Sequence, residues 1–277
     1  MNKTVSNNEP NEQTSNQENT INLDIIARVV SPYKEKFAIP RQPGLVTAAT
    51  GKVVLLNKAN NVELVRGLEQ FSHIWLIFVF HATKQHGWKP LVRPPRLGGN
   101  KKMGVLSTRS TFRPNPIGMS VVRLEKITYN NKQVELHISG LDLLDQTPIV
   151  DIKPYIPYSD AIVDAQAGFA QEQPNDSKVV SFTQQSLQVL QNVAAEYPNL
   201  QRLIEQVLAQ DPRPAYKQKN TAVSKSSDNI TSDINVSDIK SNGSASFDDK
   251  VYGIRLYRFN IKWCLISASN IEVFEII

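Results

Sequence analysis

The segment IWLIFVF, Ile74–Phe80, is the longest apolar run of this 277-residue chain. Every position is apolar, and all but one of the residues are β-branched or aromatic, which favours a strand over a helix. Because successive side chains of a strand point to opposite faces, an unbroken apolar run predicts a strand that is buried on both faces. The run is far too short to cross a bilayer as a helix.

Short apolar segments bounded by turn residues recur on both sides of this strand, and Asn130-Asn131 predicts a hairpin turn between two of them. A single short helix is predicted over Asn61–Phe71, although Gly67 weakens its pattern. Many short strands joined by turns and long loops predict a small β-barrel or sandwich of about 130 residues. The further strands are predicted at Ile25–Val30, Lys52–Leu56, Met103–Thr108, Met119–Ile127, Val134–Ile138 and Ile149–Ile152.

The hydrophobic period changes near Ser181, which together with Gln184 resembles a capping box that opens a helix. Tyr197-Pro198 ends this helix, whose apolar face carries Leu187, Leu190 and Ala194. A second helix is predicted over Asn199–Ala209, because one face is apolar at i, i+3, i+4, i+7 and i+8. The residues on that face are Leu200, Leu203, Ile204, Val207 and Leu208.

Two antiparallel strands are predicted at Val251–Ile266 and Ile271–Ile277, where apolar and polar residues alternate. The chain should therefore be mainly β, with a barrel domain followed by a small α+β domain. Residues 1–20 and 217–249 are polar and without periodicity, which predicts a disordered tail and a disordered insertion. The expected division is 1–20 tail, 21–170 barrel, and 171–277 C-terminal domain containing the insertion.

Positive charge is concentrated in one part of the chain. Between Glu69 and Glu125 there are nine Lys and Arg residues and no Asp or Glu, whereas the whole chain has a net charge of only +5. The densest part is RPPRLGGNKKMGVLSTRSTFRPNPIGM, Arg93–Met119, in which prolines and glycines rule out a long helix or a central strand. Such a loop system suits a polyanion or an anionic cofactor.

Several kinds of site are excluded by what the sequence lacks. The single cysteine, Cys264, rules out an internal disulfide or a cysteine-rich zinc site, and it is expected to be a buried small residue. The four histidines do not have structural-zinc spacing, and the glycine patterns of a Rossmann site or P-loop are missing. The first twenty residues have no apolar core, so neither a signal peptide nor a membrane anchor is expected. We expect a soluble, cytoplasmic protein without a metal.

Four polar clusters remain as candidates for chemistry. Pro40–Gly44 is a stiffened loop and His81 directly follows the central strand, but a surface turn and a satisfied structural histidine are the ordinary interpretations. Ser107–Pro116 is dense in donors and fixed by prolines, which favours a functional role. In Leu141–Pro148, Asp142 could accept hydrogen bonds from a ribose diol or could simply cap a turn.

Five segments together resemble the TsaA-like family and, within it, the bacterial TrmO-type tRNA methyltransferases. The similarity extends from about Ile25 to the C-terminus, apart from the insertion. It is carried by SPYKEKFAIPRQPG (Ser31–Gly44), RPPRLGGN (Arg93–Asn100), STRSTFRPNPIGMS (Ser107–Ser120), LDLLDQTPIVDIKPY (Leu141–Tyr155) and AQDPRPAY (Ala209–Tyr216).

This resemblance implies a homodimeric β-barrel enzyme that uses S-adenosyl-L-methionine. The implied reaction is methylation of N6 of N6-threonylcarbamoyladenosine at position 37 of threonine tRNA, beside the anticodon. A barrel enzyme of this kind would lack the Rossmann glycines that most methyltransferases carry.

The resemblance also implies the site residues. The family's cofactor contacts correspond to Pro40, Arg41, Gln42, His81, Ala82, Arg109, Met119, Gly140, Leu141 and Asp142. Arg109 would bind either the methionine carboxylate or a substrate phosphate. The catalytic base is unknown, and His81 is a candidate, although cofactor contact is the preferred role. The residues expected to bind tRNA are Arg93, Arg96, Lys101, Lys102 and Arg113 in the basic segment, and Asp211, Arg213 and Tyr216 in the C-terminal motif.

Three alternatives to this interpretation are open. The chain could be a non-catalytic RNA-binding barrel that does not bind a cofactor, or a methyltransferase that acts on a small metabolite or peptide. Arg93 and Arg96 could instead have a structural role, pairing with Asp151 or with other acids across a dimer.

Overall fold

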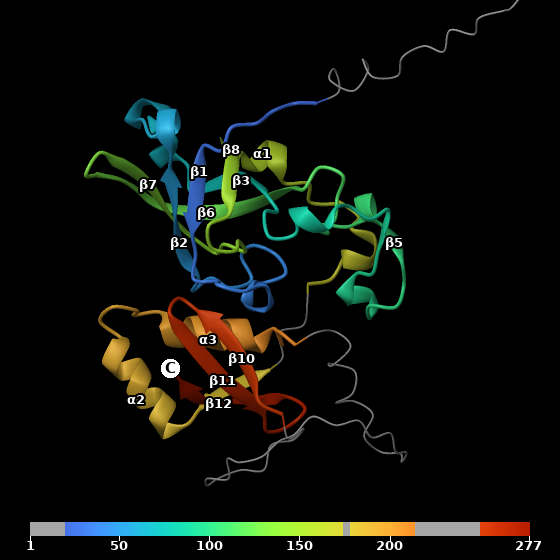
Figure 1. The fold of residues 1–277 in the computed structure, drawn as a ribbon, viewed down its shortest axis with the longest axis vertical. Coiled ribbons are helices and arrows are strands. Elements are labelled where there is room, and N and C mark those ends of the chain that lie inside the picture. The colour runs from blue at the N-terminus through green and yellow to red at the C-terminus, as the bar shows by residue number, and fades with distance from the viewer. Residues whose placement is uncertain (1–19, 174–177, 214–249) are drawn as a thin grey trace, which may run out of the picture.

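The computed structural model describes residues 20–173, 178–213 and 250–277. Six antiparallel strands form a closed barrel in the order β1-β2-β7-β6-β3-β8, which confirms the predicted barrel. The barrel forms the upper part of Figure 1, and a smaller sheet with two helices lies below it. The barrel strands are β1 (Ala27–Val30), β2 (Thr50–Leu55), β3 (His73–Val79), β6 (Ile117–Asn130), β7 (Gln133–Ser139) and β8 (Pro148–Pro154).

The central strand, β3, pairs with β6 on one side and with β8 on the other. Only alternate residues are fully buried, so the prediction of burial on both faces is wrong. Ile74, Leu76 and Phe78 fill the barrel, because one face of every strand in a closed barrel points inward. On the outer face the Trp75 indole packs against Tyr155 and donates a hydrogen bond to Asp160 Oδ2 at 2.9 Å.

The hairpin between β6 and β7 is confirmed, with Asn130 opposite Gln133. Asn131 and Lys132 both have positive φ (50° and 63°), as a two-residue type I′ turn requires. The prediction of a helix over Asn61–Phe71 is wrong. Two 3₁₀ turns, η3 (Val62–Val65) and η4 (Leu68–Gln70), take its place, because Gly67 between them is left-handed at φ 86°.

A long excursion leaves the barrel between β3 and β6. It consists of short elements: η5 (Lys84–His86), β4 (Leu91–Val92), η6 (Pro95–Leu97), β5 (Met103–Gly104) and η7 (Val105–Ser107). The strand predicted over Met103–Thr108 is therefore mostly a 3₁₀ turn. The excursion is held by β4–β5 pairing, by the Lys89 ammonium over the Phe112 ring, and by backbone bonds from Lys89 N to Phe112 O and from Val105 N to Pro90 O. Other short turns are η1 (Lys36–Ala38), η2 (Asn57–Ala59), α1 (Pro157–Asp160) and η8 (Gly168–Ala170).

The C-terminal part is a four-stranded sheet in the order β10-β11-β12-β9, with β9 parallel to β12. The predicted small α+β unit is confirmed, but the strand prediction is wrong in detail, because β10 and β11 are separate strands and β9 was not predicted. Ser181 lies in β9, and the cap of α2 is Thr183, whose Oγ1 accepts from Ser186 N. The elements are β9 (Val179–Phe182), α2 (Gln184–Val193), α3 (Leu200–Ala209), β10 (Tyr252–Leu256), β11 (Phe259–Leu265) and β12 (Asn270–Ile276).

Helix α3 lies at the end of the C-terminal part that is nearest to the barrel, level with the upper ends of β10 and β11 (Figure 1). Its five predicted core residues, Leu200 to Leu208, are all buried, which confirms the apolar face. Gln206 faces the barrel, where its Oε1 accepts from Ala48 N at 2.9 Å and its Nε2 donates to Thr47 Oγ1 at 3.0 Å. A second junction joins Tyr33 to Leu256 in an isolated β-bridge.

Cys264 is buried in β11, as predicted. In the described ranges no helix is long and apolar enough to cross a membrane. Nearly all of the predicted tail and the whole of the predicted 217–249 insertion lie outside the described residues.

Gly51 on β2 tests how tightly the barrel rim is packed. An added Cβ would lie 2.6 Å from the Val30 carbonyl oxygen and 3.0 Å from Leu141 Cδ1. We predict that Gly51→Ala lowers the free energy of unfolding by about 1–3 kcal/mol, since the backbone oxygen cannot move aside cheaply. Gly104→Ala is the control, because its nearest neighbour would be Ser107 Oγ at 3.8 Å. Urea titration of both variants measures the difference, and equal stabilities would contradict the prediction.

Candidate functional site

Loops from distant parts of the sequence meet at one rim of the barrel. Gly44 N donates to Gly140 O at 2.8 Å and Gly140 N donates to Ala49 O at 2.9 Å, so the Pro40–Gly44 loop lies against the start of the Leu141–Pro148 loop. Gly140 has φ 71°, a left-handed conformation that favours glycine. The Ser107–Pro116 loop reaches the same rim through Arg109, whose Nη1 donates to Gln42 Oε1 at 2.5 Å.

Asp142 is the chemically most distinctive residue at this rim. Its carboxylate accepts a hydrogen bond from Ser120 Oγ at 2.6 Å, and Ser120 is buried on β6 opposite Leu76. Burial raises the pKa of Asp142 to about 6, against the effects of the Ser120 bond, the Asp142 backbone and the Arg109 charge. A largely buried carboxylate with acceptor capacity left beside a cation is suited to binding a polar ligand.

His81 follows the end of β3, where Phe80 N donates to Pro116 O at 2.7 Å and holds the strand end against β6. Burial lowers the pKa of His81, a hydrogen bond to the Val79 backbone opposes this, and the nearby Arg28 charge lowers it further. The imidazole is therefore mainly neutral at pH 7 and can accept a hydrogen bond or a proton.

The other predicted cofactor residues occupy the same loops and strand ends. Pro40 and Leu141 are buried and support the rim, whereas Arg41 and Ala82 are exposed. Met119 lies opposite Ile77 on β6 and is 56% exposed, which is unusual for a large apolar side chain. Together the rim offers a cation, a buried carboxylate, an amide and apolar surface, a set that can hold a ligand with a carboxylate, a hydroxyl pair and an apolar part.

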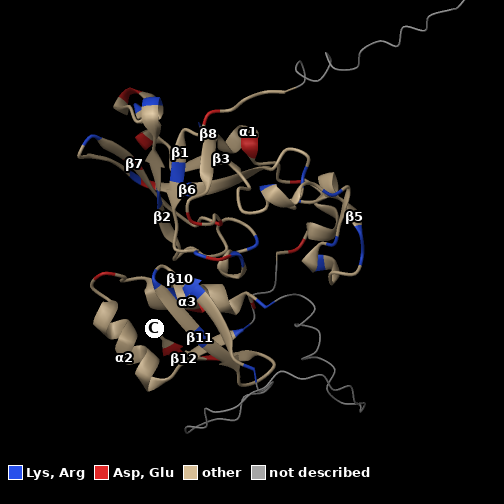
Figure 2. Cartoon of the chain, viewed as in Figure 1, with Lys and Arg blue, Asp and Glu red and all other residues tan. Residues whose placement is uncertain are grey.

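The basic residues Arg93, Arg96, Lys101 and Lys102 are all exposed on the excursion, which appears beside β5 in Figure 2. The Arg96 guanidinium donates to the Glu172 carbonyl. Asp151, a proposed structural partner of Arg93 and Arg96, pairs with Lys153 of its own strand at 2.9 Å.

Arg113 also lies in this basic segment, but it is only partly exposed. Its Nη1 donates to Thr108 O at 2.7 Å and closes the Ser107–Pro116 loop. Arg113 therefore shapes the loop that carries Arg109.

Asp211 and Arg213 of the C-terminal motif pair with each other. The Arg213 side chain is 1% exposed and forms a two-point ion pair with Asp211, both contacts at 2.7 Å, while its guanidinium lies over the Tyr252 ring. This pair fixes the chain where it leaves α3. The binding of tRNA by Asp211 and Arg213 stays a prediction. Tyr216 lies outside the described residues.

Two residues beside Asp142 were not predicted. Ser120 donates to Asp142, and Tyr33 is fully buried near it. Both stand inside quoted family segments, but nothing in the local sequence marks them, since a serine in a strand or a tyrosine after a proline is ordinary. Tyr33 is more than 100 residues from Asp142 in the sequence, and Ser120 is 22 residues from it. Only the folded chain brings these residues near Asp142.

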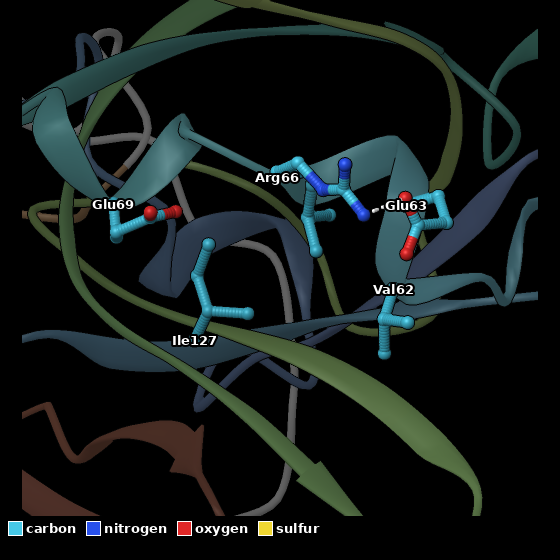
Figure 3. Close-up of a pocket in the computed structure, with 6 residues that line it drawn as sticks. Val62, Glu63, Arg66, Glu69 and Ile127 are labelled. Atoms are coloured by element: carbon cyan, nitrogen blue, oxygen red, sulfur yellow. Dashed lines mark ion pairs between the residues drawn. The ribbon is translucent and has the colours of Figure 1, made fainter.

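A separate open hollow lies where η3 and η4 pass over β6 (Figure 3). Arg66 and Glu63 form an ion pair at its edge. The hollow contains none of the predicted site residues, so it is no candidate for the cofactor. Its lining consists of Val62, Glu63, Val65, Arg66, Glu69 and Ile127. Among the residues that the structure describes, no group of three or more His, Cys, Asp or Glu side chains could hold a metal.

Comparison with known proteins gives consistent matches along the chain. The family model of the tRNA-methyltransferase O N-terminal domain matches residues 28–161, and that of the TrmO C-terminal domain matches residues 175–228. The tRNA (adenine(37)-N6)-methyltransferase of Escherichia coli K12 is 45% identical over 91% of this chain and 95% of its own length.

Two further relatives come from Pseudomonas aeruginosa. The putative S-adenosylmethionine-dependent methyltransferase RcsF is 48% identical over 93% of this chain and 98% of its own. A crystal structure of TrmO matches with a TM-score of 0.72 and 34% identity, and covers 94% of this chain and 100% of that one.

The raised pKa of Asp142 leads to a prediction about how the free energy of unfolding depends on pH. The pKa of Asp142 is about 6 in the folded protein, above its ordinary value of 3.8, so the folded state favours the protonated carboxyl. The contribution of this group to the free energy of unfolding is therefore complete below about pH 4 and is lost as the pH rises through 6. Asp142→Asn should therefore raise the free energy of unfolding at neutral pH by about 1–3 kcal/mol, with a gain that shrinks toward pH 4.

Thermal unfolding across pH measures this gain. Asp151→Asn is the control, because an exposed pair with Lys153 contributes little. A destabilised Asp142→Asn protein at neutral pH would contradict the prediction.

Proposed function

The chain belongs to the tRNA-methyltransferase O family, and we propose that it methylates N6 of adenosine 37 in tRNA with S-adenosyl-L-methionine as the methyl donor. The observation that carries this proposal is the barrel rim at which Asp142, Arg109 and Gln42 converge. The finer assignment, N6-threonylcarbamoyladenosine in threonine tRNA as the substrate, follows from the sequence resemblance.

The residues at the rim fit the chemistry of this cofactor. S-adenosyl-L-methionine supplies an electrophilic methyl group and also carries a carboxylate, an amino group and a ribose diol. The Arg109 guanidinium is suited to the carboxylate, and Gln42 orients it through their hydrogen bond. The Asp142 carboxylate can accept from the amino group or the diol, and the exposed Met119 and buried Pro40 supply apolar surface.

The residues of this chain would act mainly by positioning. Holding a nucleophile in line with a reactive carbon can supply about 7–11 kcal/mol of the barrier. Ser120 fixes the Asp142 carboxylate, and the Gly44–Gly140 bond fixes the two loops against each other, so little reorganisation is needed on binding. His81, neutral at pH 7, is able to accept a proton, although cofactor contact is the role we prefer.

We assign tRNA binding to the exposed basic excursion and to the C-terminal part. Arg93, Arg96, Lys101 and Lys102 are exposed in the acid-free segment, as phosphate contacts require. The Asp211–Arg213 pair would act by holding the C-terminal motif in place. The proposal includes a homodimer in the cytoplasm, with cofactor binding assigned to residues 21–170 and tRNA binding to 171–277 together with the excursion.

The central test is a methyl-transfer assay on purified threonine tRNA with and without the threonylcarbamoyl group. We expect one methyl group to be added to the modified adenosine, detected by nucleoside mass spectrometry, and no transfer without S-adenosyl-L-methionine. Arg109→Gln should weaken cofactor affinity about tenfold or more in calorimetry, since it removes a charge-assisted contact.

Other outcomes of this assay separate the alternatives. Tight tRNA binding with no calorimetric signal for the cofactor would indicate a non-catalytic RNA-binding barrel. Cofactor binding with no methylation of any tRNA would indicate a small-molecule substrate.

The basic excursion makes a prediction about salt dependence. Each phosphate contact removed should lower the slope of log affinity against log salt by about 0.7–0.9. Alanine variants of Arg93, Arg96, Lys101 and Lys102 should each show this loss in tRNA binding, with cofactor affinity unchanged. Lys58→Ala, at an exposed site on the barrel, is the control for a lost positive charge. Unchanged slopes in all four variants would exclude the excursion as the RNA contact.

A further inference from the structure

Gln206 of α3 makes contacts that the proposed function does not use. Its Oε1 accepts a hydrogen bond from Ala48 N at 2.9 Å, and its Nε2 donates to Thr47 Oγ1 at 3.0 Å. These partners precede it by 158 and 159 residues in the sequence, and both belong to the barrel. A single side chain of the C-terminal part therefore holds two consecutive residues at the rim of the barrel.

The two partners of Gln206 lie in a tight turn just before β2. Ala49 N donates to Val46 O at 3.2 Å, which closes the turn. Ala48 is buried, with 6% of its surface exposed, and a buried backbone N–H group needs an acceptor. Gln206 Oε1 is that acceptor for Ala48 N. Loss of this acceptor would leave the N–H group unpaired or force the turn to move.

The same turn is bonded on both sides to Gly140. Ala49 O accepts from Gly140 N at 2.9 Å, and Gly44 N donates to Gly140 O at 2.8 Å. Gly140 comes two residues before Asp142, and Gly44 comes two residues after Gln42. The position of the turn therefore determines how the two loops that carry these side chains lie against each other.

Helix α3 gives Gln206 a rigid support. Its neighbours along the helix are buried on the apolar face, so the backbone at this position has little freedom. The buried core is continuous from this face of α3 into the barrel, where it includes the turn itself. The residues concerned are Leu203, Ile204, Val207 and Leu208 on the helix, and Val46, Ala48 and Ala49 in the turn. The amide of Gln206 is thus a fixed partner for the turn.

We propose that Gln206 is a positioning residue for the cofactor loops: it holds the turn at residues 46–49, which in turn fixes Gly140 and the segment that presents Asp142. This inference rests on the proposed function, because it takes residues 40–42 and 140–142 as cofactor contacts. It gives the C-terminal part a role in cofactor binding, in addition to the tRNA binding assigned to it above.

Gln206→Met tests the proposal, because it removes the amide and keeps a side chain of similar length. Loss of the hydrogen bond should raise the KM for S-adenosyl-L-methionine about three- to tenfold. The kcat at saturating cofactor and the KM for tRNA should stay unchanged. A residue that only supported the fold would lower the amount of active enzyme, and so the apparent kcat, without changing the KM for the cofactor.

Two further variants show whether the hydrogen bond itself matters. Gln206→Glu keeps an oxygen that accepts from Ala48 N and from the Thr47 hydroxyl, so it should restore the wild-type KM for the cofactor. Gln201→Met is the matched control, because the Gln201 amide donates within α3, to Glu205 Oε1 at 2.9 Å, and its KM should equal that of the wild type. A Gln206→Glu enzyme as impaired as Gln206→Met would overturn the proposal.

Hydrogen exchange measures the positioning without any ligand. In Gln206→Met, the amides of Gly44 and Gly140 should exchange about three- to tenfold faster than in the wild type, because the turn that holds them is loosened. Gln201→Met should show no such change. Unchanged exchange at both glycines would contradict the positioning role.

The two proposals can fail separately. If the wild-type protein does not bind S-adenosyl-L-methionine, the proposed function is overturned, while the exchange measurement still decides whether Gln206 fixes these loops. If the wild-type protein binds the cofactor and Gln206→Met leaves its KM unchanged, only the role of Gln206 is overturned.

Discussion

Closure of the barrel is the constraint on which the rest of the structure depends. The first and last barrel strands, β1 and β8, meet through only two registered pairs, Ala27 with Ile149 and Arg28 with Pro148. This short contact removes both free edges of the sheet and brings the loops after β1 and before β8 to the same rim. The Tyr33–Asp145 backbone bond follows from that closure, whereas the Gly44–Gly140 bond continues the ladder of the neighbouring strands β2 and β7, in which Thr50 lies opposite Ser139. Without it, the segment after β1 would lose its hydrogen bonds from Asp145 N to Tyr33 O and from Ser31 N to Asp145 Oδ1, just before β8.

Two electrostatic environments lie next to each other here: the desolvated Asp142 carboxyl at the rim and the exposed basic excursion. Asp142 is only partly exposed, and desolvation raises the pKa of its carboxyl to about 6. Outside the rim, the basic excursion stays in solvent, where charges attract a polyanion at long range. Arg109 stands between the two, bound to Gln42 and close enough to influence Asp142. The exposed basic side chains and the rim around Asp142 are therefore connected through the loop that carries Arg109.

Local pattern predicted most of the elements but not all of their details. The existence of strand β3, the apolar face of α3 and the hairpin at Asn131 could be predicted, because apolar runs, helical period and turn chemistry are local properties. Which face of β3 is buried could not be predicted, because all its residues from Ile74 to Val79 are apolar. The Asn61–Phe71 helix failed at Gly67, where one left-handed residue outweighs a helical pattern. Strand β9 was missed because Ser181 and Gln184 resemble a helix start, while pairing with the distant β12 makes Ser181 part of a strand. The burial of Arg213 and its pairing with Asp211 could not be predicted from the motif that contains both residues.

The sequence by itself determined the mainly β architecture, the amphipathic α3, the single acid-free basic segment and, through family resemblance, the loops that form the rim. All of these depend on the order of residues along short stretches. Only the tertiary structure decided that Ser120 and Tyr33 lie beside Asp142, that Asp142 is buried enough to titrate near neutral pH, and that the Asp211–Arg213 pair is internal. The physical reason is that burial and pairing depend on residues far away in sequence, and no local pattern records which partner a side chain will meet.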